Sequence, residues 1–143
     1  MGYSDEVKDI RDELVTRLKE ITVLGSRVYK GLPKSTNVFP TAFVNFSRDD
    51  SELINTSAPL YRHDLTFEIM IKDKWSRKPE EDVDTLVERV GLIIDKLKDY
   101  TTNPTKWDLL RINNVEYVFQ TRRGRGSYVL LDTLITITVS KKW

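Results

Sequence analysis

The stretch YRHDLTFEIMIK, residues 61 to 72, alternates between apolar and polar side chains through its second part. Successive side chains of a β-strand point to opposite faces, so this period of two predicts a strand. Its apolar face consists of Leu65, Phe67, Ile69 and Ile71. Its polar face consists of Asp64, Thr66, Glu68 and Lys72. One buried face and one wet face are typical of antiparallel sheets, so a second layer must cover one side only.

Two segments with apolar residues at helical spacing supply that layer. The first is expected to begin with Ser4 as the cap and to end at Gly25, and its stripe consists of Val7, Ile10, Leu14, Leu18 and Ile21. The second opens with Pro79 and a run of acidic residues, which suit a helix N-terminus, and runs to about Tyr100. Its stripe consists of Val83, Leu86, Val87, Val90, Ile93, Ile94 and Leu97.

Four further segments are predicted to be strands: 26–31, 41–47, 109–120 and 127–140. The intervening segment 48–59, RDDSELINTSAP, is interpreted as a polar loop or an extended excursion. The order of elements is then α-β-β-β-α-β-β. The sequence therefore predicts a single α+β domain over residues 1–143. It consists of an antiparallel or mixed sheet with both amphipathic helices on one face and a long C-terminal β-hairpin.

Charge and composition exclude several classes of protein. The chain has 23 Lys and Arg against 22 Asp and Glu, so it lacks the basic excess of a general nucleic-acid binder. It has no cysteine, which rules out disulfides, thiolate catalysis and cysteine-ligated zinc. No apolar run approaches the roughly 20 residues of a membrane span. The acidic, polar start MGYSDEVKDI is unlike a signal peptide, so we expect folding in a cytoplasm and no membrane partner.

Nothing in the sequence predicts catalysis or a cofactor. The single histidine, His63, is interpreted as structural, and none of the common metalloprotease, phosphate-loop, serine-hydrolase or dinucleotide motifs is present. The acids Asp49, Asp50 and Glu52 lack the glycine and the spacing of a calcium-binding loop. We expect no catalytic, metal-binding or cofactor-binding residues.

The segment QTRRGRGSYV, residues 120–129, is basic and lies between two predicted strands. Gly124 and Gly126 allow the positive φ angles of a tight turn, so the segment is predicted to be a hairpin tip. Its arginines, Arg122, Arg123 and Arg125, are either solvated or meet an acidic protein patch or a phosphate backbone.

The last strand is not fully polar on the face opposite its core side. Leu130 and Leu134 alternate there with Asp132, Thr136 and Thr138. A residual apolar patch of this kind favours contact with another subunit, although a covering loop would satisfy it too.

These elements resemble a family. An N-terminal amphipathic helix leads to GSRVYKGLP and PTAFVNFS, and an alternating strand, the helix VDTLVERVGLIIDKL and a closing hairpin follow. Over nearly the whole chain this order is similar to that of the tail terminator, or tail completion, proteins of long-tailed bacteriophages and related viruses.

The resemblance implies a virion protein that is made in the host cytoplasm. Such subunits form a hexameric ring at the head-proximal end of the tail tube, which ends tube polymerisation and offers the head–tail joining surface. The implied partners are further copies of the chain, the major tail tube protein and a connector or neck protein, while DNA passes through the bore as cargo.

Charge and expected exposure, and not matched family positions, then assign candidate contacts. Arg122, Arg123 and Arg125 would line the bore or touch the connector. Asp49, Asp50 and Glu52, placed in a loop after TAFVNFS, would contact the tube or the neighbouring subunit, as would Leu130 and Leu134. Two alternatives stay open: a neck or connector ring protein, and a small nucleic-acid-binding module that uses the arginine-rich tip.

Overall fold

A computed structural model describes residues 2–32, 39–74, 79–122 and 128–143. The elements are α1 (Tyr3–Lys19), β1 (Val28–Lys30), β2 (Thr41–Asn55), β3 (Leu60–Lys74), α2 (Pro79–Asp99), β4 (Leu109–Arg122) and β5 (Tyr128–Lys142). Within the described residues the strands form one sheet in the order β1-β2-β3-β5-β4. β1 is parallel to β2 and the other pairs are antiparallel, so the predicted α+β fold with a mixed sheet is confirmed.

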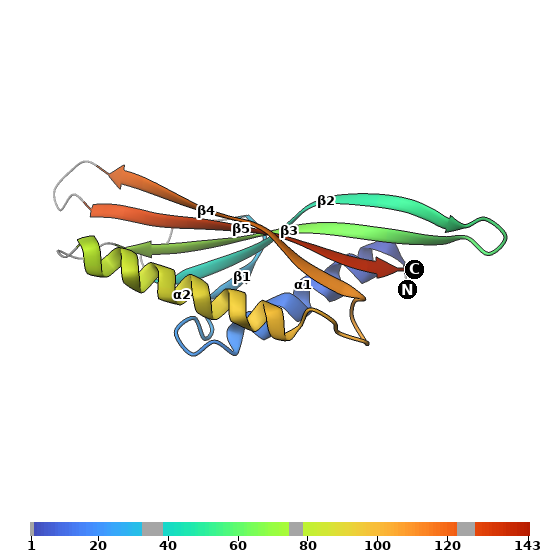
Figure 1. Ribbon diagram of the computed structural model, residues 1–143, viewed down its shortest axis with the longest axis horizontal. Helices are drawn as coiled ribbons and strands as arrows, with labels where there is room; N and C mark the ends of the chain where they lie inside the picture. The colour runs from blue at the N-terminus through green and yellow to red at the C-terminus, as the bar shows by residue number, and fades with distance from the viewer. Residues whose placement is uncertain (1, 33–38, 75–78, 123–127) are drawn as a thin grey trace.

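Both helices lie against the same face of the sheet (Figure 1). Odd-numbered residues in the middle of β3 form the centre of the core: Leu65, Phe67, Ile69 and Ile71 are fully buried. They pack in one cluster with most of the apolar stripes of α1 and α2, and this cluster also includes Ile135, Ile137 and Val139 of β5. Val87 was predicted to belong to the α2 stripe but is half exposed, which corrects that assignment. The period-two pattern therefore identified the face that the helices cover.

The boundaries of α1 differ from the prediction. The helix begins at Tyr3 with Gly2 as its cap residue, so the expectation that Ser4 caps it is wrong. It ends at Lys19, six residues before Gly25, where the Glu20 N–H donates to the Arg17 carbonyl and tightens the last turn. Gly25, with φ at +52°, instead closes a turn that carries Ile21 and Leu24 into the core.

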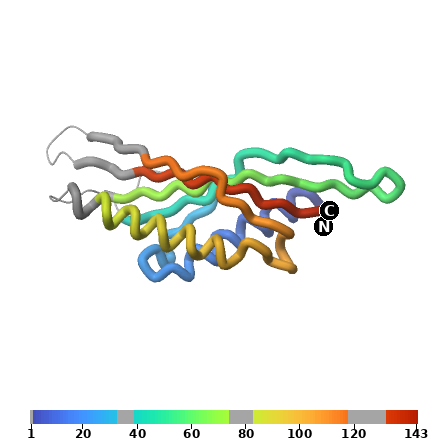
Figure 2. The backbone as a smooth tube through the Cα atoms, in the orientation of Figure 1, coloured from blue at the N-terminus to red at the C-terminus, as the bar shows by residue number. Residues whose placement is uncertain are grey.

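The β2–β3 hairpin is longer than the predicted strands. β2 continues to Asn55, so the loop interpretation of residues 48–59 is wrong for most of that segment and the extended alternative is right. At the turn, the Asn55 side-chain oxygen accepts hydrogen bonds from the Ser57 N–H at 3.1 Å and the Ala58 N–H at 3.5 Å. Figures 1 and 2 show this hairpin reaching past both chain termini as a projecting arm.

The predicted C-terminal hairpin is confirmed by antiparallel pairing between β4 and β5 along both strands, with one bulge between Ile112 and Asn114. The tip that joins the two strands, residues 123–127, lies outside the described residues.

Candidate assembly surfaces

The three acidic candidates lie on a strand and not in a loop. Asp49, Asp50 and Glu52 all belong to β2, which corrects their predicted position. A β-bulge between Phe46 and Arg48 shifts the alternation of β2 by one residue. Asp49 consequently points to the helix-covered face, where it pairs with Leu65, while Asp50 and Glu52 point to the opposite face. The three carboxylates therefore do not form one cluster.

Asp50 and Glu52 take part in an exposed network of ion pairs on that opposite face, which we call the outer face. The Arg48 guanidinium lies 2.7 Å from the Asp50 carboxylate, and the Arg62 guanidinium lies 2.7 Å from that of Glu52. Arg62 also lies 3.7 Å from Asp64. Exposed pairs of this kind contribute little to stability, so they are free to exchange partners at an interface.

Asp49 and His63 form a largely buried pair at the base of the arm. Asp49 Oδ2 lies 2.8 Å from Nδ1 of His63, and Ser51 Oγ lies 3.0 Å from the same nitrogen. The His63 ring stacks on Trp143 with centroids 3.6 Å apart. A catalytic relay requires the hydroxyl and the carboxylate on different ring nitrogens, so this arrangement does not resemble one. Its evident effect is to tie the arm to the C-terminus.

Leu134 lies in an apolar row across the outer face. The strand register places Tyr29, Phe43, Met70 and Leu134 side by side on β1, β2, β3 and β5. The Tyr29 and Phe43 rings are 5.7 Å apart, and Tyr29 remains half exposed. Leu134 is partly buried in this row, and Leu130, whose backbone pairs with Lys74 and Gln120, lies further along the same strand. The sequence did not reveal that the patch extends across four strands.

The outer face of β5 is also less wet than predicted. Asp132 and Thr138 are both buried, which corrects the expectation that they face water. One carboxylate oxygen of Asp132, Oδ1, has no hydrogen-bond partner among the described residues. Burial raises the pKa of Asp132 above its usual value, and the charge of Lys72, its cross-strand neighbour, opposes that rise. Asp132 is therefore a source of instability when ionised.

The arginine-rich tip is placed only in part. Arg122 is the last residue of β4, and its backbone pairs with Tyr128 across the hairpin. Arg123 and Arg125 lie outside the described residues. The role of these arginines stays a prediction.

Two strand edges are open, a feature that the sequence did not indicate. Among the strands that the structure describes, β4 lies at an edge and pairs with β5 alone, and near its start the Leu110 N–H donates to the Thr101 carbonyl at 2.7 Å. At the other side of the sheet, β1 pairs with β2 only at residues 42–44. In the described part of the chain, no strand pairs with the rest of that β2 edge, as far as Asn55. Long unpaired edges present rows of unsatisfied main-chain donors and acceptors, and these favour pairing with another strand.

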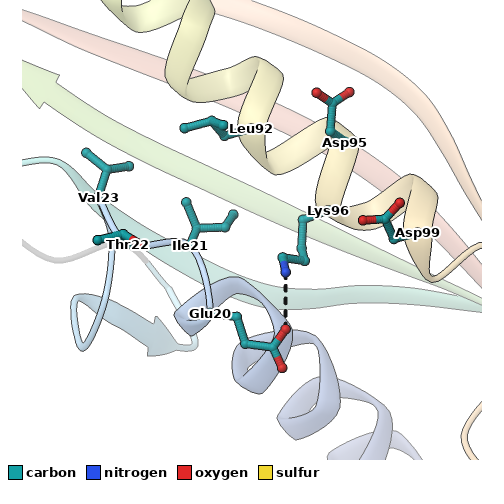
Figure 3. Close-up of a pocket in the computed structure, with 8 residues that line it drawn as sticks. All are labelled: Glu20, Ile21, Thr22, Val23, Leu92, Asp95, Lys96 and Asp99. Atoms are coloured by element: carbon teal, nitrogen blue, oxygen red, sulfur yellow. Dashed lines mark hydrogen bonds and ion pairs between the residues drawn. The ribbon is translucent and has the colours of Figure 1, made fainter.

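A groove lies between α2 and residues 20–23, the segment that follows α1 (Figure 3). It has a volume of about 630 Å³, and its lining includes Ile21, Val23 and Leu92. On its rim, Lys96 Nζ lies 3.2 Å from a Glu20 carboxylate oxygen. This pair holds the two helices together, so we interpret the groove as a seam of the helical layer.

Among the described residues, no three His, Asp or Glu side chains gather closely enough to hold a metal ion. Over the same part of the chain, no helix is both long enough and apolar enough to cross a membrane.

No protein-family model matches the sequence, and no protein with a curated description matches it. Among solved structures, the chain is similar to one described as "Virion of native gene transfer agent (GTA) particle". The sequence identity is 13%, the match covers 89% of this chain and 91% of that chain, and the TM-score is 0.38. A similarity this low carries no argument about what the chain does.

Proposed function

We propose that this chain is a virion structural protein of the tail terminator type. It forms a closed ring on the head-proximal end of the tail tube, stops tube polymerisation and provides the surface for head–tail joining. The resemblance in element order supports this role, and so does the shape of the subunit. The chain has no catalytic role in this proposal.

The observation that carries the proposal is the projecting β2–β3 arm. The arm extends past the termini and bears exposed apolar side chains: Leu53, Ile54 and Tyr61 are each more than 40% exposed. Exposed apolar groups on a projecting hairpin are costly in water unless another surface covers them. A neighbouring subunit or the end of the tube is the natural cover in a ring.

The charged candidates keep their places in this scheme as proposals. Asp50 and Glu52 lie on the same arm and are exposed at 59% and 64% of their side chains, so they are accessible to the tube or a neighbour. Arg122, Arg123 and Arg125 are assigned to the bore or to the connector protein, with DNA only as cargo. The ring is proposed to be a hexamer in the neck region of the virion.

Electron microscopy of the purified chain mixed with preformed tail tubes tests the proposal. The tubes are polymerised from the major tail tube protein of the same virus. We expect a ring at one end of each tube and no further elongation when tube protein is added. Tubes that stay uncapped and keep growing would overturn the proposal.

A matched pair of variants locates the contact. Leu53→Glu with Ile54→Glu on the arm should abolish capping, because two carboxylates would then have to be buried. Val87→Glu is the control, since Val87 is exposed to a similar degree but lies on α2, away from the arm. Equal capping by both variants would remove the arm from the mechanism.

A further inference from the structure

The two open edges of the sheet run in opposite directions. β2 is antiparallel to β3, β3 to β5, and β5 to β4, so β4 runs opposite to β2. In a ring, rotation about the ring axis keeps the strand direction of every copy and places one side of a subunit against the other side of its neighbour. The β4 edge of one copy therefore meets the β2 edge of the next copy in antiparallel orientation, with all helices on the same side.

The charges along the two edges are complementary in that orientation. On the outer face β4 carries Arg111 and Glu116, and β2 carries Arg48 and Glu52. A bulge between Ile112 and Asn114 adds one residue to β4, so Arg111 and Glu116 lie opposite Thr138 and Leu134, which are four residues apart on β5. Arg48 and Glu52 are also four residues apart on β2, so the two pairs of charges have the same spacing along their strands. Antiparallel pairing then sets Arg111 opposite Glu52 and Glu116 opposite Arg48.

Arg111 and Glu116 are also available for such contacts. Both side chains are exposed, and neither has an ion-pair partner within the part of the chain that the structure describes. Their counterparts on β2 are held only by exposed pairs, Arg48 with Asp50 and Glu52 with Arg62. Little is lost when those pairs rearrange.

From this we infer that β4 of one copy pairs with the Arg48–Glu52 stretch of β2 in the next copy, so that one β-sheet continues from subunit to subunit. The inference names the subunit contact of the ring and rests on the proposed function for the closure of that ring. It places the unpaired main-chain groups of both edges in hydrogen bonds at once.

A two-fold dimer through β4 alone is the competing arrangement. Arg111 of each copy would then pair with Glu116 of the other copy across the two-fold axis. That arrangement leaves the β2 edge open from Asn45 to Asn55, whereas pairing of β4 with β2 covers the Arg48–Glu52 part of that edge. The two arrangements predict different cross-links.

Engineered cysteines test the contact cleanly, because the chain has none of its own. Asp50 and Asn114 face each other in the inferred register and are both exposed. Within one chain β3 and β5 separate them, so their Cα atoms are at least about 14 Å apart, too far for a disulfide. Asp50→Cys with Asn114→Cys should therefore form disulfide-linked chains of two and more copies under mild oxidation.

Two controls make the result decisive. Asn114→Cys alone should stay uncross-linked, and a disulfide dimer from it would overturn the inference in favour of the two-fold arrangement. Asn114→Cys with Ser57→Cys should also stay uncross-linked, since Ser57 lies in the turn beyond the pairing stretch. Absence of a disulfide from the Asp50 and Asn114 pair, at the protein concentration where wild-type chains associate or at the solubility limit, overturns the inference.

Charge reversal provides a second readout that does not depend on oxidation. Glu116→Arg should weaken self-association about fivefold in sedimentation equilibrium, and adding Arg48→Glu should restore it. Circular dichroism checks that each variant is folded. Failure of the second change to restore association overturns the register.

Rings on tube ends without the disulfide refute this contact but not the proposed function, and the disulfide without tube capping refutes the function but not the contact.

Discussion

Replacement of Trp143 by alanine tests whether the base of the arm is held by the C-terminus. The Trp143 indole stacks on His63 with centroids 3.6 Å apart and planes inclined by 15°. Its main chain exchanges hydrogen bonds of 3.0 and 2.9 Å with Tyr61 of β3, and alanine retains these. The substitution therefore removes side-chain contacts only.

The expected loss follows from those contacts. An aromatic pair contributes about 0.5–1.5 kcal/mol beyond its burial. The partly buried indole hides on the order of 100 Å² of apolar surface, which adds about 2.5 kcal/mol. We expect Trp143→Ala to lower the free energy of unfolding by about 3 kcal/mol. For a chain of 143 residues this corresponds to a fall in Tm of about 10 °C.

Differential scanning calorimetry at neutral pH measures this shift. Trp143→Phe is the matched control, because a smaller ring still stacks on His63 and should lose less than half as much. A fall in Tm of under about 2 °C for Trp143→Ala would refute the reasoning, since each kcal/mol moves Tm by about 3 °C in a domain of this size. An equal loss in both variants would show that stacking is not the cause.

Three further substitutions test the fold. Asp132→Asn should raise Tm at pH 7 and change it little at pH 3. Burial raises the folded-state pKa of Asp132, so the wild-type protein loses stability as pH rises above the ordinary Asp pKa of about 3.9. An equal effect at both pH values would contradict this. Phe67→Ala should cost about 3–5 kcal/mol in chemical denaturation, because the ring is fully buried in the core; a loss below about 1 kcal/mol would contradict the packing. Gly31→Ala should cost about 1–2 kcal/mol, since Gly31 has φ at +96° but no atom near a new Cβ; an unchanged Tm would show that the turn relaxes freely.

The layers of this fold could be predicted from the sequence because each depends on a local period. The alternation from Leu65 to Ile71 fixed the covered face of β3, and the helical stripes fixed the sides of α1 and α2 that pack on it. The helix ends were less accessible, because Ser4 and Gly25 each satisfy a capping rule that the structure does not use. The cap residue Gly2 makes no side-chain hydrogen bond, and Glu20 at the other end keeps a right-handed helical conformation.

The candidate site was less predictable because it depends on strand order. No property of β4 alone indicates that it lies at an edge, and only the sequence β1-β2-β3-β5-β4 leaves Arg111 and Glu116 at an open boundary. The run of charged residues that includes Asp49, Asp50 and Glu52 suggested a loop. Charged residues are nevertheless stable in a strand when the neighbouring strand supplies the opposite charge, as Arg62 of β3 does for Glu52.

The bulge at Ser47 explains how one strand serves both the core and an interface. Before the bulge, Ala42, Val44 and Phe46 point to the helices, and an uninterrupted alternation would direct Arg48, Asp50 and Glu52 to the same side. The extra residue reverses the alternation, so these charges reach the outer face and Asp49 turns inward to His63. A single inserted residue thus separates the half of β2 that stabilises the domain from the half that is available to another subunit. The change of side occurs just beyond residues 42–44, where β1 stops covering the edge.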